Sequence, residues 1–116
     1  MKKILIVEDS QLLQMVWKKT FAGKLEVICA FSVSEAEEKF TIHSDIIAIV
    51  MDGCVPGTEF NTGPLVIKFR AKFTGPIIAV SSFPHLRQEL VSAGCSHQCD
   101  KMFLPQKLRE VLNLQN

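Results

Sequence analysis

The sequence alternates short apolar runs with amphipathic stretches five times along its 116 residues. Three of the runs, 4–7, 46–51 and 77–80, are continuously apolar, which is typical of central strands that helices cover on both faces. Repeated strand–helix alternation predicts a parallel sheet, because parallel strands need crossover connections. We therefore expect one α/β domain over residues 1–116. Its strands should lie within 3–7, 24–31, 45–52, 75–82 and 97–101, and its helices within 10–23, 32–40, 63–73, 84–94 and 104–114.

Local signals indicate where several helices begin and end. Ser34 and Glu37 have the spacing of a capping box, which predicts the N-terminus of the second helix. Pro64 is expected in the first turn of the third helix, and Gly94 just after the end of the fourth. The apolar residues at near-helical spacing in the first helix are Leu13, Val16, Trp17 and Phe21.

Composition and charge exclude several classes of protein. Apolar residues make up 47% of the chain and charged residues 22%, which favours a packed core over disorder. The formal net charge is +1 without a basic block, so we expect no nucleic-acid partner. The longest apolar run is too short for a bilayer, and the N-terminal apolar stretch is too short for a signal peptide. We expect a cytoplasmic protein with no membrane partner and with its four cysteines reduced.

Polar side chains stand where four of the expected strands end. In an open parallel sheet, ligands bind outside the carboxyl ends of the strands, so residues at those ends should converge on one site. The residues are Glu8, Asp9, Asp52, Ser81 and Lys101.

This combination of residue types suits phosphoryl transfer. Three neighbouring carboxylates repel one another, and a divalent cation relieves the repulsion. Mg²⁺ prefers hard oxygen ligands, while a lysine and a hydroxyl suit the oxygens of a phosphate. A carboxylate beside a metal and a lysine can act as a nucleophile and form an aspartyl phosphate. The sequence therefore predicts a phosphoryl-transfer site with Mg²⁺ as its cofactor.

Four segments, "ILIVEDS", "IVMDGCVPG", "PIIAVSS" and "AGCSHQCDK", resemble in order the signature segments of CheY-like response-regulator receiver domains. The resemblance covers essentially the whole chain. It implies a flavodoxin-like fold whose five-stranded parallel sheet has the order 2-1-3-4-5, with helices on both faces. It also implies a single-domain two-component signalling module, phosphorylated by a histidine kinase or a histidine phosphotransfer protein and signalling by binding an output protein that the sequence does not identify. Such a module is no enzyme beyond its own phosphorylation and dephosphorylation.

The resemblance implies a role for each residue of the group. Asp52 would be the phosphoacceptor, Ser81 the switch hydroxyl and Lys101 the phosphate-binding lysine. The magnesium ligands would be Asp9 directly, Glu8 largely through water, Asp52 itself and the backbone carbonyl of Cys54.

The chain departs from the family pattern at three places. Met102 stands where the family usually has a proline after the lysine, which predicts a non-proline cis bond or a rearranged loop. Gln98 occupies the usual position of an aromatic switch residue. The loop after Asp52 is longer than usual, with Gly63 seven residues beyond Pro56.

These departures leave other functions open. One is a receiver-like scaffold that binds partners without phosphorylation, and another is a phosphorelay intermediate or phosphate sink. An aspartyl phosphatase is less well supported, because that class usually has a second acid where this chain has Cys54. Cys95, His97 and Cys99 alternate and offer three soft ligands for zinc, but without the usual pair spacing or a fourth ligand nearby.

Overall fold

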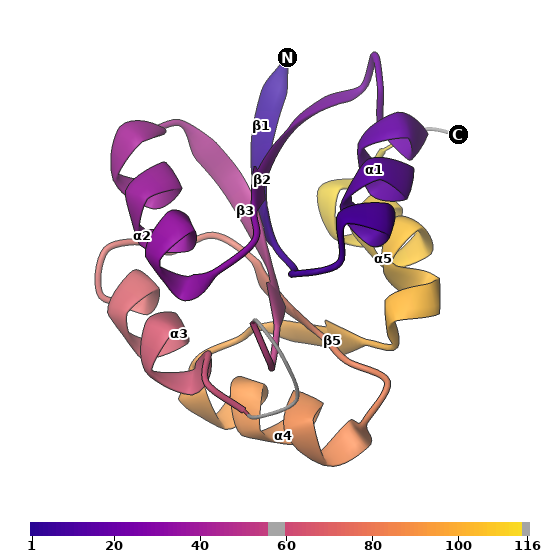
Figure 1. The fold of residues 1–116 in the computed structure, drawn as a ribbon. Helices are drawn as coiled ribbons and strands as arrows, with labels where there is room; N and C mark the ends of the chain where they lie inside the picture. The colour runs from indigo at the N-terminus through magenta and orange to yellow at the C-terminus, as the bar shows by residue number, and fades with distance from the viewer. Residues whose placement is uncertain (56–59, 115–116) are drawn as a thin grey trace.

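The computed structural model describes residues 1–55 and 60–114 and contains one parallel sheet with strand order β2-β1-β3-β4-β5. Helices lie on both sides of it, with α1 and α5 on one face and α2 and α3 on the other (Figure 1). The predicted fold class is thus confirmed. The strands are β1 Lys2–Val7, β2 Leu25–Ala30, β3 Ile46–Asp52, β4 Ile77–Val80 and β5 His97–Cys99. The helices are α1 Gln11–Thr20, α2 Val33–Ile42, α3 Gly63–Arg70, α4 Pro84–Ala93 and α5 Leu104–Leu112, with a 3-10 turn at Lys101–Phe103.

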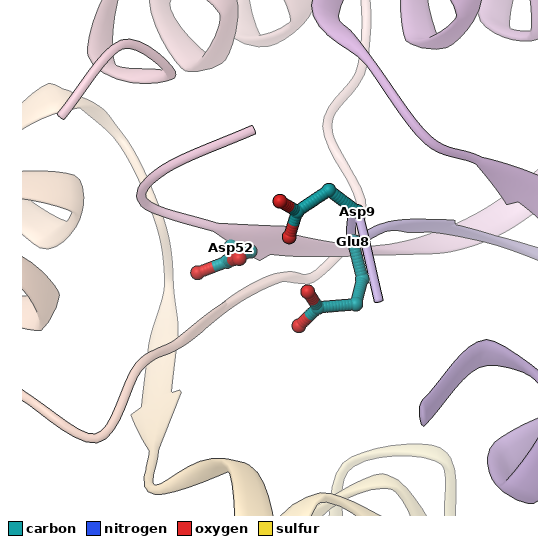
Figure 2. A group of neighbouring side chains, drawn as sticks. All are labelled: Glu8, Asp9 and Asp52. Atoms are coloured by element: carbon teal, nitrogen blue, oxygen red, sulfur yellow. The ribbon is translucent and has the colours of Figure 1, made fainter. Parts of the chain in front are cut away.

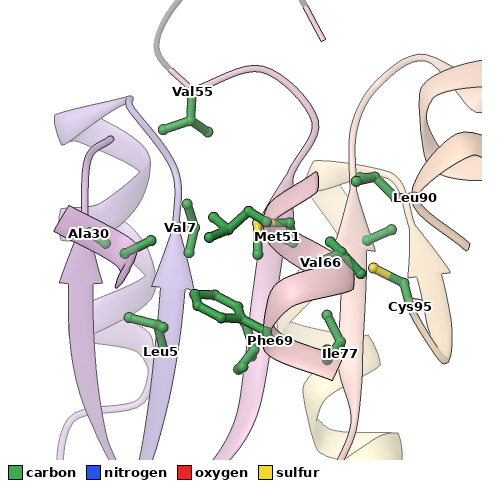
Figure 3. Close-up of a cluster of buried hydrophobic side chains, with 14 of the residues drawn as sticks. Leu5, Val7, Ala30, Met51, Val55, Val66, Phe69, Ile77, Leu90 and Cys95 are labelled. Carbon is green, nitrogen blue, oxygen red and sulfur yellow. The ribbon is translucent and has the colours of Figure 1, made fainter. Parts of the chain in front are cut away.

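Two hydrophobic cores, one on each face, hold the sheet between the helices. Phe69 of α3 and Leu90 of α4 belong to the first core, and the Phe69 ring lies over the central strands (Figure 3). Trp17 of α1 and Leu108 of α5 belong to the second. Each such side chain contributes about 1.5–3 kcal/mol on burial. The central strands contribute to both cores, which explains why their sequences are continuously apolar. No helix in the described part of the chain is long and apolar enough to cross a membrane.

The buried face of α1 differs from the predicted one. Trp17 and Phe21 are buried as expected, but Val16 is 46% exposed and Gln14 is only 2% exposed. Val16 directly precedes Trp17, so it lies about 100° around the helix from that buried residue, and its side chain turns toward solvent. The predicted place of Val16 was therefore wrong, and a polar residue lies on the face that packs against the sheet.

The N-terminus of α2 also differs from the prediction. Ser32, not Ser34, is the N-cap: its Oγ accepts a hydrogen bond from Glu35 N–H at 3.2 Å. Glu35 Oε1 accepts from Phe31 N–H at 2.9 Å. The same S-x-x-E spacing occurs twice, two residues apart, and the earlier pair is used because Ser32 follows the end of β2 in extended conformation. Glu37 instead pairs with Lys68 across α2 and α3 at 3.3 Å.

The other predicted helix ends are confirmed. Pro64 lies in the first turn of α3. Gly94 follows α4 with a φ of 137°, a conformation that favours glycine. Arg70 Nε donates to the Gly94 carbonyl at 3.0 Å and so ties the end of α3 to this turn.

Candidate functional site

The register of the sheet brings the predicted polar residues together. Val7 of β1 pairs with Met51 of β3, so Glu8 and Asp52, the next residue on each strand, lie side by side. Asp52 pairs with Val80 of β4, which places Ser81 at the same edge. Parallel pairing of β4 with β5 brings the segment after Cys99 to this edge too.

The acidic residues converge on one point. One carboxylate oxygen each of Glu8, Asp9 and Asp52 lie within 4.8 Å of one another. Figure 2 shows the three carboxylates facing a common space, two from the end of β1 and one from the end of β3. Lys101 Nζ lies 2.8 Å from Glu8 Oε1 and 3.2 Å from Asp52 Oδ2, so one ammonium bridges two of the acids.

Burial dominates the electrostatics of this group. Glu8 is 0% and Asp52 4% exposed. Burial raises the pKa of Glu8 to about 7, against the opposing effect of Lys101. It also raises the pKa of Asp52, again opposed by Lys101. Burial alone would lower the pKa of Lys101, but the hydrogen bond with Glu8 and the charge of Asp52 raise it overall.

The donor set fits a hard divalent cation. Three carboxylates lie together and the Lys101 ammonium pairs with two of them, Glu8 and Asp52; carboxylate oxygens are hard ligands of the kind that Mg²⁺ prefers. Across the described ranges, this is the one group of three His, Cys, Asp or Glu side chains whose ligand atoms come so close. Cys95, His97 and Cys99, considered above for zinc, do not form such a group.

Two of the three acids, Asp9 and Asp52, border a hollow that is open to solvent. It has a volume of about 280 Å³, large enough for a phosphoryl group with water. The third acid, Glu8, is fully buried and does not line the hollow. The lining residues are Asp9, Asp52, Cys54, Ser81, Ser82, Phe83, Leu86 and Lys101.

Hydrogen bonds hold the backbone of Asp52 as well as its carboxylate. Thr62, 0% exposed, donates from Oγ1 to the Asp52 carbonyl at 2.7 Å. A backbone hydrogen bond from Cys54 lowers the pKa of the Asp52 carboxyl against the larger effect of burial. Asn61 closes the segment by accepting from Val55 N–H at 2.9 Å and donating to the Val55 carbonyl at 2.7 Å. Residues 56–59 of the longer loop lie outside the described residues.

Ser81 lies at the end of β4, 3% exposed. Its Oγ accepts a hydrogen bond from Phe83 N–H at 3.0 Å, and its carbonyl accepts one from Arg87 Nη1 at 2.7 Å. Arg87 Nε also donates to Gln98 Oε1 at 3.4 Å. Arg87 thus connects the residue of the predicted switch hydroxyl to the position where the family usually has an aromatic ring.

The segment after β5 forms a turn that needs the residue after Lys101 to be something other than the proline usual in the family. Asp100 Oδ1 accepts from Met102 N–H at 2.9 Å and caps the 3-10 turn Lys101–Phe103. A proline at position 102 has no N–H and could not make this bond. The turn nevertheless leaves the Lys101 ammonium within reach of both Glu8 and Asp52.

The acids, the hydroxyl and the lysine of the site could be predicted from the sequence, but the residues that hydrogen-bond to their backbones could not. Gln14, Thr62 and Arg87 each donate to backbone carbonyls of site residues. Every residue has a backbone carbonyl, so the sequence does not indicate which of them accepts a hydrogen bond from a distant side chain. For Gln14 there was one signal, because a glutamine stands among the apolar residues of α1.

A five-stranded parallel sheet in this order, with acids at the ends of β1 and β3, is the fold of CheY-like response-regulator receiver domains. The sequence matches no protein-family model and no curated protein. Among solved structures, the chemotaxis protein CheY4 of Vibrio cholerae is similar with a TM-score of 0.78 and 27% identity, covering 97% of each chain. A two-component response regulator from Clostridium difficile has a TM-score of 0.83 and 19% identity, covering 100% of this chain and 99% of its own. The BeF3-activated N-terminal receiver domain of Klebsiella pneumoniae RstA has a TM-score of 0.80 and 21% identity, covering 97% of this chain and 100% of its own.

Proposed function

We propose that this chain is a receiver module of two-component signalling, which accepts a phosphoryl group on Asp52 from a histidine kinase or a histidine phosphotransfer protein. The observation that carries the proposal is the position of Asp52. Its carboxylate borders an open hollow, with Lys101 3.2 Å away and two further acids within 4.8 Å. A nucleophile, a cation and a site for hard metal ions thus share one space.

Each residue has a part in the proposed transfer. A carboxylate oxygen of Asp52 forms the new bond to phosphorus as the bond from phosphorus to the donor nitrogen breaks. Lys101 moves its ammonium toward a phosphoryl oxygen. Ser81 Oγ already accepts from Phe83 N–H, so its own hydrogen can be donated to another phosphoryl oxygen.

The metal fits beside these groups. Asp9, Asp52 and the backbone carbonyl of Cys54 would hold Mg²⁺, with Glu8 acting through water. The ion supplies positive charge for the phosphoryl oxygens, which three carboxylates would otherwise repel.

Incubation with acetyl phosphate and Mg²⁺, followed by intact mass measurement, tests the proposal. The wild-type protein is expected to gain the mass of one phosphoryl group, and Asp52→Asn none. Asp45→Asn is a matched control, because Asp45 is exposed and pairs with Lys3 instead of Lys101. No gain in the wild-type protein, or an equal gain in Asp52→Asn, would contradict the proposal.

A scaffold that works without phosphorylation is the second candidate. It is favoured by Gln98, which is exposed and pairs with Arg87 where the family usually has an aromatic switch residue. The same experiment separates the two, because a scaffold gains no phosphoryl group. A phosphorelay intermediate would gain one and pass it to a histidine phosphotransfer protein.

The entrance of the hollow predicts a long-lived phosphorylated form. Phe83, 59% exposed, and Cys54 line it, and neither side chain positions water well for attack on an acyl phosphate. Phe83→Glu is expected to shorten the lifetime severalfold, measured as timed loss of the phosphoryl mass. Phe103→Glu is the matched control, because Phe103 is also 59% exposed but does not line the hollow. Equal decay in all three proteins would contradict the prediction.

A further inference from the structure

A buried glutamine amide reaches three backbone carbonyls beneath the site. Gln14 Nε2 lies 2.8 Å from the Ile6 carbonyl oxygen and 3.2 Å from those of Glu8 and Ala30. The side chain is on the face of α1 that packs against the sheet, and the residue is 2% exposed. Its Oε1 is buried and has no hydrogen-bond partner among the described residues.

The orientation of this amide is fixed by its surroundings. The nitrogen carries two hydrogens for three acceptors, so at least one hydrogen is shared. Turning the amide over would point Oε1 at three carbonyl oxygens, which repel it. Burying Oε1 without a hydrogen-bond partner costs free energy, so an apolar side chain of similar size would stabilise the packing of α1 more than glutamine does. The amide is therefore explained by the carbonyls that it holds.

One of those carbonyls joins two acids of the site. The Glu8 carbonyl belongs to the planar peptide group between Glu8 and Asp9, so holding its oxygen orients both residues. The Ala30 carbonyl also accepts from Glu8 N–H at 3.0 Å, which ties this segment to the end of β2. Ser10 N–H donates to Glu8 Oε2 at 3.1 Å. Glu8 is thus held at its N–H, its carbonyl and its carboxylate.

We infer that Gln14 is a positioning residue for the metal-binding acids, setting the orientation of Glu8 and Asp9 from inside the fold. The inference rests on the proposed function, because it assigns Gln14 to the magnesium site of the receiver module. Residues that orient metal ligands through hydrogen bonds commonly change metal affinity by 10–100-fold when they are replaced.

Calorimetric titration with Mg²⁺ at pH 8 and low temperature tests the inference on folded protein. Gln14→Met keeps the size of the side chain but removes its donors, and is expected to weaken Mg²⁺ binding about tenfold. Gln11→Met, at an exposed position of the same helix, is expected to leave the affinity unchanged. In an Asp9→Asn background, Gln14→Met should weaken binding by much less, because the ligand that it positions is already altered.

Amide hydrogen exchange gives a second readout without metal. The Glu8 and Ser10 amides are expected to exchange faster in Gln14→Met than in Gln11→Met, because their acceptors are no longer held. If Gln14→Met does not fold, Gln14→Asn, whose amide is too short to reach all three carbonyls, takes its place in both measurements. Unchanged Mg²⁺ affinity in Gln14→Met, or unchanged exchange of both amides, would overturn the inference. The proposed function would still stand if the wild-type protein binds Mg²⁺. Absence of binding in the wild-type protein would overturn both.

Discussion

Lys101→Met is expected to destabilise the protein by about 3 kcal/mol at pH 8, because removing one partner of a buried ion pair leaves an uncompensated charge. Lys101 Nζ lies 2.8 Å from Glu8 and 3.2 Å from Asp52, both of which are buried. The lysine side chain is 25% exposed, so water replaces part of its effect and the loss should fall at the low end of the usual range. The variant is also expected to lose most of its phosphorylation, because the cation that would pair with the phosphoryl group is gone.

The loss of stability should depend on pH. The pKa of Glu8 is raised to about 7 by burial, so at pH 5.5 this residue is mostly protonated and needs its cation less. Urea unfolding at both pH values is the measurement, and the loss is expected to be clearly smaller at pH 5.5.

Lys68→Met is the matched control for Lys101→Met. Lys68 pairs with Glu37 at 3.3 Å, but the two side chains are 66% and 43% exposed. An exposed pair of this kind contributes at most about 1 kcal/mol, with little dependence on pH in this range. Equal losses in Lys68→Met and Lys101→Met would show that burial does not govern the charges of the site.

The fold and the residues around the hollow could be predicted from the sequence because both depend on periodic patterns. Continuously apolar runs marked β1, β3 and β4 as strands covered on both faces. Parallel strands end at one edge of a sheet, so the polar residues after them had to meet there. Asp52 and Lys101, which are 49 positions apart, come within 3.2 Å for this reason.

Features that depend on competition between close alternatives could not be predicted. The S-x-x-E spacing occurs at both Ser32 and Ser34, and only the point where β2 ends selects the first. Val16, which its spacing groups with the apolar residues of α1, is exposed and Gln14 is buried, because the sheet decides which face of the helix is covered. Thr62 acts on the backbone of Asp52, and no side-chain pattern records a backbone acceptor.

These positioning residues also explain how the fold tolerates a concentration of like charges. Carboxylates at the ends of β1 and β3 would separate if their backbones were loose. Gln14 holds the Glu8 carbonyl and Thr62 the Asp52 carbonyl, both by hydrogen bonds from inside the protein. The stability of the surrounding sheet thereby offsets the repulsion between the carboxylates. Replacing one of the acids with a neutral residue should relieve that repulsion and raise the free energy of unfolding.

Glu8→Gln is accordingly expected to make the protein more stable at pH 8, by about 2 kcal/mol. The pKa of Glu8 is about 7 in the folded protein, compared with 4.5 as its ordinary value, because of burial. Folded protein therefore binds this proton more tightly than unfolded protein, and stability falls as the pH rises from about 4.5 through 7. The difference between these pKa values corresponds to roughly 3 kcal/mol, and loss of the Glu8–Lys101 ion pair in the variant offsets part of it.

The comparison of Glu8→Gln with wild type across pH isolates this one residue, because the other titrating groups are common to both proteins. Urea unfolding without Mg²⁺ should give a small difference at pH 5 that grows between pH 5 and 8. Glu37→Gln, which removes an exposed carboxylate, should show no such growth. Mg²⁺ should stabilise the wild-type protein more at pH 8 than at pH 5.5, because it competes with the proton for the same acids. If the difference in free energy of unfolding between Glu8→Gln and wild type stayed constant with pH, the pKa of Glu8 would not be raised. Burial would then not be what holds the Glu8 carboxyl near its neutral form until a cation binds.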